Sequence, residues 1–154
     1  MQRLTWVLIA SLLASSVTNA AETAATPSFD AALAEKLGAD EHGMRHYVLV
    51  ILKTGPTPVP KGEQRTAMFK GHFANMERLA ADGKLAAAGP LDGVDGWRGM
   101  FIFAVKDIDE ARQLTATDPV IASGEMVAEY HQYYGSAALM QVSETHKRIM
   151  KPGQ

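Results

Sequence analysis

The side chain best suited to chemistry in this chain is His72. It lies in a segment (residues 65–90) that is typical of an amphipathic helix, a glycine stop, a short strand and a Gly-Pro turn. Helical spacing places His72 at the margin of the apolar stripe, and an imidazole can take and return a proton near neutral pH. Arg65 stands seven residues earlier, two helical turns away on nearly the same face, where its guanidinium could hold a substrate carboxylate. The pattern indicates acid/base chemistry on a small acid.

Purely structural roles for the same residues stay open. A single histidine beside an apolar stripe is often a structural hydrogen-bonding residue, and Arg65 could be a solvated helix residue. Trp97 and the three tyrosines at 130, 133 and 134 could line a pocket mouth, although core or dimer-interface positions explain them more simply.

Several other chemistries lack the residues that they require. The sequence has no cysteine nucleophile, no Gly-x-Ser-x-Gly elbow, no phosphate loop and no dinucleotide fingerprint. The pair His42 and His46 has metal-ligand spacing, but Gly43 lies between them and no third ligand is near. We therefore expect no metal and no cofactor. Fifteen basic residues against 17 acidic ones, with no basic run, argue against nucleic acid as a partner.

Hydrophobic patterning predicts the elements that must position His72. Apolar and β-branched runs predict strands, helical spacing predicts two helices, and prolines and glycines mark a loop at residues 54–62. Asp107 is the expected N-cap of the second helix, and a short bent connection is expected at residues 120–124. The strands are residues 47–53, 84–88, 98–105 and 125–134, and the helices are residues 63–82 and 108–117.

The order strand, helix, strand, strand, helix, strand predicts an α+β fold of the ferredoxin-like βαββαβ type. Such a four-stranded antiparallel sheet carries its helices on one face, so the other face needs a cover. Pairing of two sheets about a two-fold axis is the simplest cover, and we expect a homodimer.

The chain resembles the YciI-like (YCII-related) family over residues 47–134. The resemblance implies a dimeric α+β barrel, related to muconolactone isomerase-like proteins, and a site built on a histidine and an aspartate. By their place in the motifs, these are His72 and Asp118. The residues that carry the resemblance are Arg65, Leu79, Gly83-Lys84-Leu85, Ala88-Gly89-Pro90, Asp118-Pro119 and Gly124.

A His72–Asp118 pair in an apolar pocket would suit removal of a proton beside a carbonyl or on a phenolic ring. Isomerisation or elimination of a leaving group would follow. Asp118 precedes a proline, so a role at a helix end is the structural alternative. Asp92, just after the Gly-Pro turn, is a second carboxylate that could contact the substrate, or a simple turn former.

The ends of the chain depart from smaller members of the family. Residues 1–20 have the positive start, apolar run and small-residue end of a secretory signal peptide, which predicts the bacterial periplasm as destination and no membrane contact after cleavage. Residues 21–43 form a leader in which residues 29–37 could be helical, with Ser28 as N-cap and Gly38 as stop. The domain proper is expected at residues 44–135, and the tail at 136–154 forms a helix or lies against a neighbour.

The sequence thus predicts one of two function classes. The first is a small secreted enzyme of the isomerase or lyase type that acts on a small carbonyl compound or aromatic acid through His72 and Asp118. The second is a non-catalytic module, dimeric and of unknown role, that uses the same cleft for a ligand or for assembly.

Overall fold

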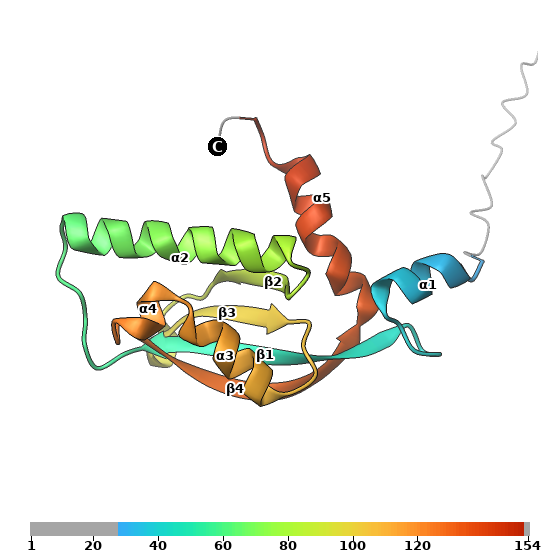
Figure 1. Ribbon diagram of the computed structural model, residues 1–154, viewed down its shortest axis with the longest axis horizontal. Helices are drawn as coiled ribbons and strands as arrows, with labels where there is room; N and C mark the ends of the chain where they lie inside the picture. Colours follow the sequence, from blue (N-terminus) through green and yellow to red (C-terminus); the bar gives the residue numbers. More distant parts are fainter. Residues whose placement is uncertain (1–27, 153–154) are drawn as a thin grey trace, which may run out of the picture.

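The computed structural model describes residues 28–152. The expected signal peptide and the first part of the leader lie outside these residues. The elements follow in the order expected for the domain (Figure 1). They are α1 (Ala31–Leu37), β1 (Met44–Thr54), α2 (Glu63–Ala81), β2 (Leu85–Pro90), β3 (Trp97–Phe103), α3 (Ile108–Ala116), α4 (Pro119–Ala122), β4 (Met126–Ser136) and α5 (Val142–Ile149), with 3₁₀ turns at Val94–Gly96 and Ala137–Gln141.

The four strands form one sheet in the order β2-β3-β1-β4, with every neighbouring pair antiparallel. The two central strands, β1 and β3, pair from Val48 with Phe103 to Lys53 with Trp97. This order, with the helices that follow β1 and β3, confirms the predicted α+β class and the βαββαβ arrangement.

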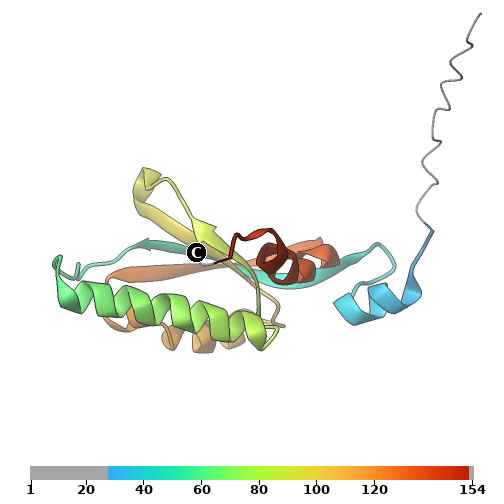
Figure 2. The same cartoon turned by 90° about the horizontal axis from the view of Figure 1, so that it is seen from above.

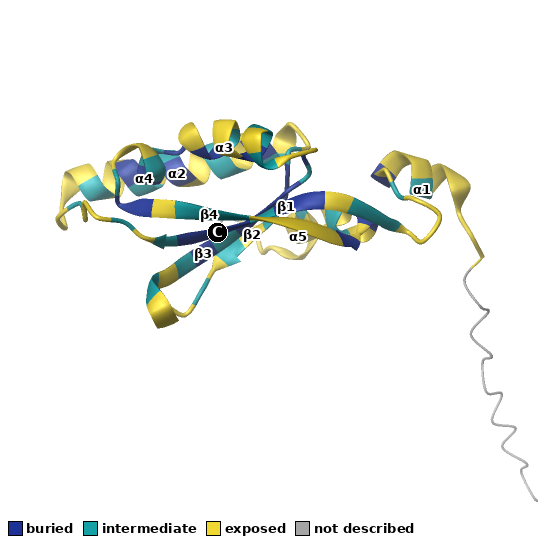
Figure 3. Ribbon diagram, turned by 90° about the horizontal axis from the view of Figure 1, so that it is seen from below, coloured by how far each residue is buried: buried dark blue, intermediate teal, exposed yellow. Residues whose placement is uncertain are grey.

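Helices α2, α3 and α4 pack on one face of the sheet (Figure 3). Alternate residues of β1, namely Val48, Val50 and Leu52, point into this layer and are buried. The alternation follows from the two-residue period of a strand. Leu79 of α2 and Phe103 of β3 complete the centre of this core.

The second face of the sheet has a smaller core that the tail partly covers. Tyr47 and Ile102 are buried there, and Leu139 and Met140 of the tail pack against them. The tail then continues as α5, on the opposite side of the sheet from α2 (Figure 3). Of the two outcomes expected for the tail, the helix is the one found.

Several expected boundaries shift for local reasons. The connection predicted at residues 120–124 contains α4, because Asp118 caps it and Pro119 occupies its first position. Strand β2 includes Pro90, which was expected in a turn. A proline without an N–H is tolerated there because β2 is an edge strand.

The leader helix α1 forms as expected, but its cap is different. Asp30 rather than Ser28 is the N-cap, since its side chain accepts a hydrogen bond from the backbone of Leu33. Gly38 ends the helix with φ of 67°, the left-handed conformation that glycine adopts most easily. In residues 28–152, no helix has the length and apolarity needed to cross a membrane.

The position of the β2–β3 hairpin relative to α2 determines where the candidate site lies. The hairpin of β2 and β3 diverges from α2 towards its tip (Figure 2). A pocket lies between α2 and this hairpin, lined by residues of both.

Candidate active site

His72 and Asp118 meet inside the helix layer. Nδ1 of His72 lies 2.9 and 2.8 Å from the two carboxylate oxygens of Asp118. His72 is 7% exposed and Asp118 is fully buried. A charge-assisted contact of this kind is stronger inside a protein than in water. The pair implied by the family resemblance therefore exists in the structure.

The middle of α2 and the N-terminus of α4 bring the pair together. Asp118 is the N-cap of α4, and its Oδ1 also accepts a hydrogen bond from the backbone N–H of Val120. Its backbone is extended because the proline that follows disfavours the helical conformation. Asp118 is thus both a helix cap and the partner of His72, so its structural role does not exclude a functional one.

Gly71 allows α4 to approach α2 closely. A Cβ atom at this position would lie 3.0 Å from Cγ of Pro119, which is tighter than ordinary van der Waals contact. The residue before His72 therefore leaves room for the turn that carries Asp118.

Aromatic rings surround the imidazole. Its centroid lies 5.3 Å from that of Phe73 and 6.0 Å from those of Phe69 and Phe101. Phe69 meets it edge-on, with an interplanar angle of 87°. These rings restrict the orientations of the imidazole and keep water away from the His72–Asp118 contact.

The other ring nitrogen of His72, Nε2, is open to an external partner. Among residues 28–152 no group forms a hydrogen bond with Nε2. This nitrogen is not fully buried, because Arg45 Nε is the buried side-chain polar atom that lacks a partner among these residues. His72 lines a pocket of about 300 Å³, the lower end of the usual size for small-molecule sites. The other lining residues are Leu52, Phe69, Phe73, Met76, Gly89, Pro90, Arg98, Gly99, Met100, Phe101 and Met126.

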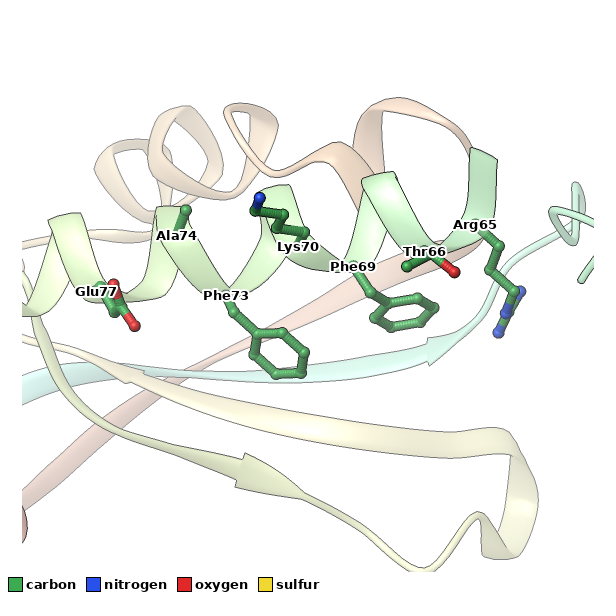
Figure 4. Close-up of a pocket in the computed structure, with 7 residues that line it drawn as sticks. All are labelled: Arg65, Thr66, Phe69, Lys70, Phe73, Ala74 and Glu77. Carbon is green, nitrogen blue, oxygen red and sulfur yellow. The ribbon is translucent and has the colours of Figure 1, made fainter. Parts of the chain in front are cut away.

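A larger hollow of about 680 Å³ lies along α2 alone (Figure 4). Arg65, Phe69 and Phe73 border it, and Figure 4 shows these three side chains extending from α2 on the side that faces the β2–β3 hairpin. Phe69 and Phe73 also line the His72 pocket, so the two hollows adjoin. The smaller pocket is the better candidate site because it contains the only buried histidine of the described residues.

The guanidinium of Arg65 is already bonded to other groups of the protein. Its Nη2 lies 2.7 Å from Oε1 of Glu125, its Nη1 donates to the carbonyl of Val59, and its guanidinium stacks over Phe69 at 4.9 Å. The expectation that Arg65 is a solvated helix residue is wrong, and its guanidinium is not free to bind a substrate carboxylate.

Glu125 is a buried carboxylate between two arginines. Its side chain is 2% exposed, and Oε1 also lies 3.6 Å from Nη1 of Arg98. The hydrogen bond from Arg65 holds the pKa of Glu125 below its ordinary value of 4.5. Burial opposes this shift, while the backbone N–H of Val59 and the charge of Arg98 add to it. Glu125 is therefore a carboxylate at neutral pH.

Neither Glu125 nor Arg98 was expected from the sequence to be a site residue. Glu125 was expected as an ordinary first residue of a strand, and Arg98 as the first residue of another. The one local signal was an ionisable residue directly after Gly124, at the start of an apolar strand. Their proximity to Arg65 depends on long-range folding.

The remaining candidate residues lie apart from the His72 pocket. The carboxylate of Asp92 accepts a hydrogen bond from the backbone of Val94, as a turn former does, and Asp92 does not line the pocket. Neither Trp97 nor the tyrosines line it. Tyr130 packs against the main core, whereas Tyr133 stacks on Tyr47 at the second face of the sheet.

Residues 44–132 match the family model of the YCII-related domain. The chain belongs to this family. The matched range includes the His72–Asp118 pair and the Arg65–Glu125–Arg98 cluster of this YCII-related domain, whereas α5 lies outside it.

The YCII-related domain was also compared with individual proteins. No curated protein gives a significant match. A solved structure of 5-chloro-2-hydroxyhydroquinone dehydrochlorinase from Burkholderia phenoliruptrix, in complex with 2,5-dihydroxybenzoquinone, is similar at 21% identity with a TM-score of 0.38. The similarity covers 56% of this chain and 90% of the other.

Proposed function

We propose that this YCII-related protein is an acid/base enzyme of the isomerase or lyase type that needs no cofactor. Its substrate is a small carbonyl compound or aromatic acid. The observation that carries the proposal is the position of His72, which lines the pocket with Nδ1 held by the buried Asp118 and Nε2 left without a bond to the described residues. A histidine held in this way is prepared for proton transfer through one defined nitrogen.

The roles of the two residues follow from hydrogen-bond chemistry. An ionised carboxylate can only accept, so Nδ1 of His72 carries a proton and donates it to Asp118. The neutral imidazole then has its lone pair on Nε2. This nitrogen takes a proton from a carbon beside a carbonyl or from a phenolic hydroxyl, and Asp118 stabilises the imidazolium that forms.

The imidazolium then returns its proton. Delivery to a different carbon of the same substrate gives isomerisation, and delivery to a departing group gives elimination. The rings of Phe69, Phe73 and Phe101 lie around the imidazole, where a flat substrate can pack against them during both steps.

The assembly and the location of the enzyme are part of the proposal. We expect a homodimer that buries the exposed part of the second sheet face, where Val127 and Tyr133 are 43% and 37% exposed. We also expect export to the periplasm and removal of residues 1–20. Fractionation of cells, with the intact mass of the mature protein, tests the second expectation.

The test of the activity is the exchange of substrate hydrogen with solvent deuterium. Small keto acids, phenols and hydroxyquinones are incubated with the protein in D₂O, and C–H signals are followed by NMR. The proposal predicts that at least one compound exchanges with the wild-type protein and that His72→Ala abolishes the exchange. His131→Ala is the matched control, because His131 is exposed and pairs with Glu129 outside the pocket.

The non-catalytic interpretation gives a different pattern. If His72→Ala leaves exchange unchanged, or no compound exchanges although several bind, the pair is a structural connection between α2 and α4. Thermal unfolding of the same variants separates the cases, since a purely structural pair affects stability alone.

A further inference from the structure

Arg98 occupies an irregular position in the sheet. In the pairing of β1 with β3, Leu52 faces Gly99 but the next residue, Lys53, faces Trp97. Arg98 is the extra residue at this point, and such a bulge changes the direction of a side chain. Strict alternation would place Arg98 on the same face as Met100, which packs in the second core.

The ion pairs show where the guanidinium lies instead. Nη1 of Arg98 approaches the same oxygen of Glu125 that Arg65 of α2 contacts. The guanidinium is therefore on the α2 side of the sheet. Arg98 also lines the pocket that contains His72.

The guanidinium of Arg98 makes fewer and longer contacts with protein groups than that of Arg65. Its distance of 3.6 Å to Glu125 is too long for a hydrogen bond, and within residues 28–152 its side chain forms none. Its side chain is 30% exposed. The three charges of the cluster leave one net positive charge, and the guanidinium of Arg98 is the one that lines the pocket with no hydrogen bond to the described residues.

The pocket otherwise has no permanent charge. Of its twelve lining residues, ten are apolar or glycine, and the other two are His72 and Arg98. An anion that enters this apolar space has one cation to meet, and a flat ring has Phe69, Phe73 and Phe101 to pack against. A guanidinium in apolar surroundings binds a carboxylate through paired hydrogen bonds.

We propose that Arg98 is the residue that selects the substrate, by binding the anionic group of a small planar acid whose reacting atom lies at His72. The inference rests on the proposed acid/base function and names its substrate class. Arg65 has a different role: it holds Glu125, and Glu125 keeps Arg98 on the pocket side.

The test compares two probes of similar shape, 2,5-dihydroxybenzoate, which carries a carboxylate, and 2,5-dihydroxybenzamide, which carries a neutral amide in its place. Binding of each probe to the mature protein is measured by calorimetry. The wild type should bind the acid at least about tenfold more tightly, which corresponds to about 1.4 kcal/mol. Arg98→Gln should bind both probes equally, and Arg98→Lys should keep part of the preference. Arg112→Gln is the matched control, since Arg112 is exposed and stacks on Tyr130 outside the pocket.

Equal binding of the two probes to the wild type would overturn the proposal. The proposal would also be overturned if Arg98→Gln still bound the acid more tightly than the amide. The same conclusion would follow if the wild type did not bind the acid at millimolar concentration. Thermal unfolding establishes that each variant is folded. If Arg98 fails this test while His72-dependent exchange persists, only the substrate class is wrong. If the acid binds through Arg98 but no compound exchanges, the acid/base function is wrong instead.

Discussion

Nδ1 of His72 lies within 2.9 Å of both carboxylate oxygens of Asp118, across 46 residues of sequence. The same carboxylate caps α4 through the backbone of Val120. One buried side chain therefore fixes a helix end and the orientation of an imidazole. This double role allows the electrostatic contribution of Asp118 to be separated from its structural one.

Asp118→Asn should reduce proton transfer far more than it reduces folding. Asparagine caps a helix about as well as aspartate, so α4 should persist. The amide cannot stabilise an imidazolium as a carboxylate does, and we expect turnover or solvent exchange to fall by roughly 100-fold or more. The loss of a hydrogen bond to a charged group should lower the free energy of unfolding by about 1.5 to 3 kcal/mol. Exchange kinetics and urea denaturation measure the two effects.

Asp107→Asn is the control for this substitution. Asp107 caps α3 in the same manner, through the backbone of Glu110, but is exposed and distant from the pocket. We expect an unchanged exchange rate and a stability within about 0.5 kcal/mol of the wild type. Equal loss of exchange in both variants would contradict the assigned role of Asp118.

Glu125 should make stability depend on pH in the acid range. Its pKa in the folded protein is below 4.5, chiefly because Arg65 donates to it. A lowered folded-state pKa gives stability that is present above the unfolded value of about 4.5 and is lost as pH falls through the folded value. Glu125→Gln should therefore be less stable at pH 7, by about 1.5 to 3 kcal/mol. The difference from wild type should shrink below pH 4.5 in urea titrations at several pH values.

Glu110→Gln provides the comparison for a partly exposed pair. Glu110 also has a lowered pKa, because Lys84 donates to it at 2.7 Å, but its side chain is 32% exposed. Solvent screening should limit the cost of this substitution to less than about 1 kcal/mol at pH 7. If both variants follow the wild-type pH profile in parallel, the ion pair of Glu125 does not contribute as described.

The sequence allowed the His72–Asp118 pair to be predicted, but not the charged residues around the pocket. His72 was identifiable because helical spacing relates it to buried residues of the same helix. Asp118 was identifiable because the Asp-Pro motif is local. Arg98 and Glu125 depend on a strand bulge and on contacts with Arg65 across the fold. No spacing rule encodes these features, because the register shift arises only when β1 and β3 pair.

The difference between local and long-range features also explains which part of the prediction for Arg65 was correct. Its place on the helix face was correct, since helical geometry is local. Its freedom to bind a substrate was not, because its partner Glu125 lies 60 residues away in the sequence. A buried carboxylate must be paired, and Arg65 satisfies this requirement before any ligand arrives.

The tail should contribute to stability through its contact with the second face of the sheet. Leu139 packs against the cluster of Tyr47, Ala86 and Ile102 and is partly buried. Leu139→Ala should lower the free energy of unfolding by about 1 to 2 kcal/mol, less than for a fully buried leucine. Val142→Ala, at a position 41% exposed in α5, should stay within about 0.5 kcal/mol. Similar values for the two variants in urea denaturation would show that the tail does not stabilise the sheet.

The proposed homodimer should depend on the uncovered part of the second sheet face. Val127 of β4 pairs with Lys53, shares its face with Ile51, and is 43% exposed. A glutamate at this position would place a hydrated charge against an apolar partner surface, and its cross-strand neighbour Lys53 is already bonded to Glu129. Val127→Glu should therefore shift sedimentation from dimer to monomer. Val94→Glu, at a turn position 64% exposed, should leave the dimer intact. A monomeric wild type, or a Val127→Glu variant that remains dimeric, would place the interface elsewhere or remove it, and the tail would then be the principal cover of this face.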